Sequence, residues 1–129
     1  MYSGELEVQA KRKAIAVLQD EINRILNAGR VLSALPRMLV NKDTAGVKDA
    51  LDQISSIEEE VENLRRKITR DVADVGGLII NRENLLNTSY TMDEIAGYIT
   101  GISFKLSNLK IKTLKTKNLE KELTELIEL

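Results

Sequence analysis

Carboxylates are the groups in this chain whose spacing could support chemistry. Glu58 and Glu62 stand four residues apart, so on a helix their side chains project from one face with Cβ atoms roughly 6 Å apart. A second acidic pair, Asp93 and Glu94, follows later in the chain. Two like charges repel, and a bound cation would relieve that repulsion. Oxygen ligands of this kind suit hard or borderline ions such as iron, manganese or magnesium.

Each acidic pair also has a simpler explanation, which we favour on spacing alone. Arg66 follows Glu62 by four residues and can neutralise it across one helical turn. Asp93 and Glu94 suit an early position in a helix, where the helix dipole favours negative charge. The spacing therefore predicts a solvated charged face more readily than a metal site.

The composition excludes most familiar catalytic groups. The 129 residues include no His and no Cys, which removes the commonest metal ligand, the usual general base near neutral pH and all thiolate chemistry. A net charge of -1 gives no overall attraction for nucleic acid. No enzyme motif is present, so we predict a protein that is not an enzyme and does not bind nucleic acid.

Leu, Ile, Lys and Glu dominate the composition and aromatic residues make up 3% of it, which is typical of an all-α protein. The length suits a single domain over residues 1–129. No stretch approaches the roughly 20 apolar residues of a membrane span, and charged residues interrupt the apolar residues of the N-terminus. We therefore expect a cytoplasmic protein without a membrane span.

The stretch Val47–Val75 predicts a long central helix. Its apolar or small residues alternate three and four apart, which is a heptad seam that only Asp71 interrupts. The members of the seam are Val47, Ala50, Ile54, Ile57, Val61, Leu64, Ile68 and Val75.

A first helix is predicted to begin near Ser3, which could cap it, and to continue for about 35 residues. Its stripe consists of Ile15, Leu18, Ile22, Ile25, Gly29, Leu32 and Leu39. Gly29 would allow a close approach of another helix. Pro36 lies on the same stripe and should kink or locally break the helix, because it lacks an amide hydrogen.

Short connections join the predicted helices. Residues 41–43 form a turn signal, with Asp43 or Thr44 as the cap of the central helix. Such a short link predicts an antiparallel hairpin of the first two helices. Gly76 and Gly77 should end the central helix, because Gly tolerates the left-handed conformation.

A third helix should begin near Asn81 and remain continuous or weakly bent through the polar residues 87–91. Its stripe consists of Leu85, Met92, Ile95, Ile99, Ile102, Leu106 and Leu109. After Leu109 a lysine-rich segment predicts a final amphipathic helix, whose apolar face still runs at Leu129. The expected architecture is an antiparallel bundle of three long helices plus a short C-terminal helix, completed by homo-oligomerisation, most simply as a homodimer.

Two stretches together resemble the PhoU-like family, in particular its short branch of phosphate-transport regulator homologues. Residues 54–68, ISSIEEEVENLRRKI, are similar to a family helix that carries two acids separated by three residues before a basic run. Residues 79–101, IINRENLLNTSYTMDEIAGYITG, are similar to the family's Asp-Arg-Glu-Asp helix start and Leu-Asp-Asp-Ile-Ala-Asp motif. Asn84 and Gly97 stand where the family usually has acids.

The resemblance implies a bundle of long antiparallel helices, a regulatory or accessory role with an inorganic phosphate transporter, and metal ions bound by acidic motifs. Carried over residue by residue, it makes Glu58, Glu62, Asp93 and Glu94 the candidate metal ligands. The alternative is a structural coiled-coil adaptor that docks a partner helix and has no metal or phosphate role.

Overall fold

The chain folds into helices alone over the residues that the structure describes. The structure is a computed structural model and describes residues 2–75, 82–109 and 119–128. The helices are α1 (Tyr2–Val40), α2 (Thr44–Val75), α3 (Arg82–Ser107) and α5 (Leu119–Glu128). The predicted all-α fold of three long helices and a short C-terminal one is confirmed.

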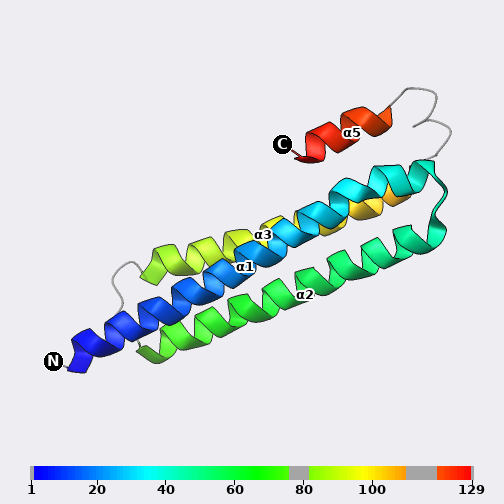
Figure 1. Cartoon of the computed structure of the whole chain (residues 1–129). Helices are drawn as coiled ribbons and strands as arrows, with labels where there is room; N and C mark the ends of the chain where they lie inside the picture. The colour runs from blue at the N-terminus through cyan, green and yellow to red at the C-terminus, as the bar shows by residue number, and fades with distance from the viewer. Residues whose placement is uncertain (1, 76–81, 110–118, 129) are drawn as a thin grey trace.

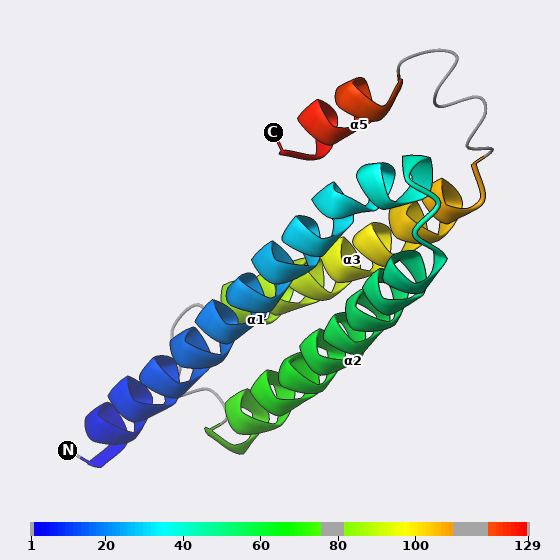
Figure 2. The same ribbon diagram turned by 45° about the vertical axis from the view of Figure 1, so that its right-hand side comes forward.

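The three long helices lie side by side as a bundle (Figure 1). α2 runs antiparallel to α1, as the short connection predicts, and α3 runs in the same direction as α1. α5 packs against the C-terminal part of α1, on the side away from α2 (Figure 2). α5 is much shorter than the other three helices, so it lies beside only one end of the three-helix bundle.

The buried face of α1 matches the predicted stripe only in part. Leu18, Leu32 and Leu39 are buried as expected, whereas Ile15 and Ile22 are 47% and 39% exposed. The seam that faces the core steps by four and three residues through Ala14, Leu18, Glu21, Ile25, Ala28, Leu32, Leu35 and Leu39. This register contains two Ala and one Glu, whereas the neighbouring register contains larger apolar residues. Side-chain size and polarity therefore favour the neighbouring register in the sequence. A side chain at Gly29 would meet nothing within 4 Å, so the predicted close helix approach there is wrong.

The beginning and the end of α1 correct two smaller predictions. α1 begins at Tyr2, so Ser3 lies inside the helix and does not cap it. Pro36 is fully buried and the helix continues beyond it to Val40, so Pro36 does not break the helix.

The turn between α1 and α2 confirms the predicted link. The Asp43 amide donates to the Met38 carbonyl at 2.9 Å and the Lys42 amide donates to the Leu39 carbonyl at 3.2 Å, which is a Schellman motif. Lys42 holds the left-handed conformation that this motif requires, with φ of 56°. The Asp43 carboxylate then accepts the Gly46 amide at 3.0 Å and caps α2.

The seam of α2 follows the prediction closely. Ala50, Ile54, Ile57, Val61 and Ile68 are buried, and Val47 and Leu64 are half-buried. At the C-terminal end Asp71 is half-buried and Val72 is buried in its place. The helix repeat of 3.6 residues, which drifts from a strict heptad, accounts for this shift.

α3 is one continuous helix through residues 87–91, as predicted. Its buried residues are Ser89, Ala96, Ser103 and Leu106, whereas Ile102 and Leu109 of the predicted stripe are 45% and 42% exposed. The three small residues recur every seven positions and alternate with Met92, Ile99 and Leu106. This seam allows α3 to lie close to α1 and α2.

The core consists of three apolar clusters along the bundle. The middle cluster joins Ala28 of α1, Ile57 and Val61 of α2 and Ala96 of α3. The cluster nearest the α1–α2 turn also receives two residues of α5, Leu123 and Ile127. The predictions for Gly76, Gly77, Asn81 and the segment 110–118 lie outside the described residues.

Candidate functional site

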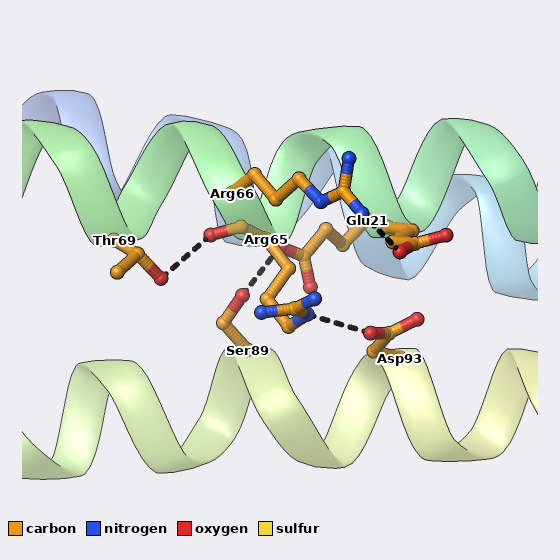
Figure 3. A network of polar contacts seen from close by, with 7 residues as sticks. Glu21, Arg65, Arg66, Thr69, Ser89 and Asp93 are labelled. Atoms are coloured by element: carbon orange, nitrogen blue, oxygen red, sulfur yellow. Dashed lines mark hydrogen bonds and ion pairs between the residues drawn. The ribbon is translucent and has the colours of Figure 1, made fainter.

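A layer of polar side chains crosses the bundle between two apolar clusters. Glu21 comes from α1, Arg65 from α2, and Ser89 and Asp93 from α3 (Figure 3). The Ser89 hydroxyl donates to Glu21 Oε1 at 2.7 Å, and Arg65 Nε donates to Asp93 Oδ2 at 2.6 Å. The layer thus ties each of the other two long helices to α3.

Glu21 is the most unusual residue in this layer. It is 0% exposed, and its Oε2 has no hydrogen-bond partner among the described residues. Burial, which disfavours the charged form, raises the pKa of Glu21 from 4.5 to about 7. Repulsion from Asp93 contributes to this increase, whereas the Ser89 hydrogen bond and the positive charge of Arg65 oppose it. The group therefore takes up or releases one proton close to neutral pH.

Arg65 joins α2 to α3 at the edge of the layer. Its side chain is 17% exposed, and its guanidinium lies 4.8 Å from the centre of the Tyr90 ring. The hydrogen bond to Asp93 is the main reason why the pKa of Arg65 is raised above its ordinary value. Arg65 stays charged and forms a charge-assisted hydrogen bond with Asp93.

A second arginine joins α1 to α2 on the other side of the core. Arg24 pairs with Glu60 of α2 and lies 3.6 Å from Asp20 on its own helix. The Arg24–Glu60 pair shows that the face of α1 with Arg24 points toward α2. The Arg65–Asp93 pair shows the same for the face of α3 with Asp93.

The four predicted metal ligands are distributed over two helices. Glu62 accepts a hydrogen bond from Arg66 at 2.7 Å, which is the i,i+4 pair expected from the sequence. Asp93 is held by Arg65. Glu94 is exposed and Glu58 is half-buried.

Residues 54–68 of α2 and residues 82–101 of α3, from the two stretches that suggested the resemblance, contact each other. A side chain at Gly97 would lie 3.8 Å from Glu58 Oε1, and Arg65 reaches Asp93 between the same helices. Within the described ranges, no group of three or more acidic side chains is placed to hold a metal ion. The metal site stays a prediction, carried by the resemblance and not by a cluster of ligands.

An apolar surface remains open on the side of the bundle opposite α2, and we call it the α1–α3 strip. It consists of Ile15, Ile22 and Leu26 of α1 and Ile95, Tyr98 and Ile102 of α3. Ile95 is half-buried, and the exposure of the other five ranges from 39% at Ile22 to 67% at Tyr98.

Helix geometry places these six residues on one surface. Ile15 and Ile22 flank the α1 seam on the side opposite Arg24, and Ile95 and Ile102 flank the α3 seam on the side opposite Asp93. Both faces therefore point away from α2. The hydrogen bond between Glu21 and Ser89 aligns the two parallel helices, so Leu26 and Ile95 lie at about the same height along the bundle.

α5 packs against the C-terminal part of α1, beyond the open residues of the strip. Pro36 follows Ile15, Ile22 and Gly29 at seven-residue spacing on the same face of α1, yet it is fully buried. Leu123 and Ile127 of α5 pack against the core cluster at this end. α5 has 10 residues, so it leaves the strip from Ile15 to Ile102 open.

Sequence reasoning missed Glu21, Ser89 and the strip. The signal for Glu21 was a heptad register through two Ala residues, and the signal for Ser89 was its recurrence with Ala96 and Ser103 every seven residues. On both helices the larger apolar residues lie in the register next to the buried one, so the sequence pattern favoured that register. The strip consists in part of residues that were predicted to form the core.

No family model, no curated protein and no solved structure matches this chain. The described helices include none with the length and apolar character needed to cross a membrane.

Proposed function

We propose that this chain is a non-enzymatic adaptor that binds a partner helix on the α1–α3 strip. The observation that carries the proposal is the set of exposed apolar side chains that follow the heptad spacing of two parallel helices. An exposed apolar surface of this kind typically marks a site of association. The parallel ridges of α1 and α3 fit the apolar face of one further helix.

Site-specific photo-crosslinking in the native host tests this proposal. A photoreactive residue replaces Leu26 on the strip, or Ser55 on the exposed face of α2 as the matched control. We expect a cross-linked partner from position 26, none from position 55, and loss of the cross-link on adding Ile22→Asp. Ile22 is 39% exposed, so the fold should tolerate this substitution. Equal cross-linking from both positions, or none from position 26, would contradict the proposal.

A second proposal is a PhoU-like regulatory or accessory role in inorganic phosphate transport, with a transporter as partner and a cytoplasmic location. The observation that favours it is the contact between the two family-like stretches, where Glu58 lies beside Gly97 and Arg65 pairs with Asp93. Metal ions of the iron, manganese or magnesium type would bind through Glu58, Glu62, Asp93 and Glu94.

Two measurements test the second proposal. Deleting the gene in the host should change phosphate uptake, and calorimetric titration of the protein with each metal ion should show binding that Glu58→Gln weakens. Unchanged uptake would contradict the transport role. No heat from any of the three ions would contradict the metal site alone.

Self-association is another way to cover the strip, and it corresponds to the homodimer expected from the sequence. Sedimentation velocity over a range of protein concentrations tests it. A dimer that Ile22→Asp dissociates would place the second copy on the strip.

A further inference from the structure

Most of the exposed charges that border the α1–α3 strip are positive. On α1, Arg12 stands three residues before Ile15, and Arg30 stands four residues after Leu26. On α3, Lys105 stands three residues after Ile102, whereas Glu94 stands four residues before Tyr98. Arg12 and Lys105 lie toward opposite ends of the strip. A partner helix with carboxylates beside its apolar face would complement this pattern.

The helix that already packs at one end of the strip has this composition. α5 contains four Glu and one Lys over Leu119–Glu128, and it packs through Leu123 and Ile127. α5 contacts α1 beyond the open part of the strip, so an acidic amphipathic helix already packs next to this surface.

A second copy of the chain fits this charge pattern poorly. If two strips packed face to face in antiparallel orientation, Arg12 of one copy would lie near Lys105 of the other. In parallel orientation each cation would lie near its own counterpart. Either arrangement brings like charges together, and like charges disfavour association.

We infer that the α1–α3 strip binds an amphipathic helix whose apolar heptad face is flanked by acidic residues. This inference rests on the proposed adaptor function and specifies the chemistry of the partner. Apolar contacts with Ile22, Leu26 and Ile102 supply most of the affinity, and Arg12 and Lys105 select acidic partners over basic ones.

Three synthetic peptides test the inference against the full chain. Each has about three heptads, which span roughly 30 Å as a helix, and each has the same Leu seam. The flanking positions carry Glu, Lys or Gln. Fluorescence anisotropy of the labelled peptides measures their affinities at low and high salt.

We expect the Glu-flanked peptide to bind at least about tenfold more tightly than the Lys-flanked peptide at low salt, with a smaller ratio at high salt. The double variant Arg12→Glu with Lys105→Glu should reverse this preference. The matched control, Lys48→Glu with Arg70→Glu, makes the same change in net charge on exposed positions of α2 and should leave the preference intact.

The outcomes separate the inference from the function on which it rests. Equal or tighter binding of the Lys-flanked peptide overturns the acidic partner and leaves helix docking in place. Failure of all three peptides to bind overturns the docking function itself. A dimer in sedimentation that Ile22→Asp dissociates replaces the acidic helix with a second copy as the occupant.

Discussion

Replacing Glu21 with Gln isolates the free energy of holding a carboxyl group inside the bundle. The amide has nearly the same shape, and its oxygen can still accept the Ser89 hydroxyl, but it never carries a charge. The variant therefore removes the titration and keeps the packing. Arg65 and Asp93, the charged groups that face Glu21 from α2 and α3, stay in place.

The direction of the effect follows from the pKa of Glu21. The group titrates near 4.5 in the unfolded chain and near 7 in the folded one, so the folded state holds its proton more tightly between these values. The unfolded chain loses this proton first as the pH rises. The contribution of Glu21 to stability is thus fully present below pH 4.5, falls as the pH rises to 7, and stays low above 7. The difference between 4.5 and 7 corresponds to about 3 kcal/mol of unfolding free energy.

We expect Glu21→Gln to unfold with nearly the wild-type free energy at about pH 4, and to exceed the wild type by about 3 kcal/mol at about pH 8. Urea denaturation followed by circular dichroism across this range gives both values. Glu59→Gln, at an exposed position of α2, is the matched control and should follow the wild type. Parallel curves for the wild type and Glu21→Gln would refute the claim that burial raises the pKa of this carboxyl group.

Three further substitutions test other parts of the structure. Gly29→Ala should stabilise the protein by about 0.5–1 kcal/mol, because Gly weakens a helix interior and the added methyl group meets no neighbour; an unchanged or lower melting temperature would show that the space is filled. Lys42→Gly should stabilise by about 1 kcal/mol, because Lys42 holds a left-handed φ of 56°, and urea denaturation measures the gain. Arg65→Ala should cost about 1–3 kcal/mol by leaving Asp93 unpaired, and a double-mutant cycle with Asp93→Asn should show coupling; additive losses would mean that the pair does not act as a unit.

The sequence was sufficient for the helices and for the α2 seam because strong apolar residues repeat there without a competing register. The turn at Asp43 was also predictable, since its cap and its short length follow local rules. α1 and α3 are different. Each carries apolar residues on two adjoining faces, so periodicity alone could not decide which face is buried.

The buried carboxyl group shows a second limit of sequence reasoning. A Glu such as Glu21 is normally placed on the surface, because burying a charge costs several kcal/mol. Its burial depends on partners that lie far away in the sequence, Ser89 on α3 and Arg65 on α2. The predicted acids Glu62 and Asp93 have arginine partners instead of a shared cluster. Pairing between helices decides this outcome, and no local pattern records it.

The central claim is that the α1–α3 strip binds a helix, and methyl NMR with the Glu-flanked peptide tests it most directly. Isoleucine methyl labelling reports on Ile15, Ile22 and Ile102 on the strip, and on the buried Ile54 and Ile68 of α2 as internal controls. We predict saturable shifts for the three strip methyl groups and much smaller shifts for the two α2 methyl groups. Shifts confined to other surfaces, or no shifts at saturating peptide, would contradict the account.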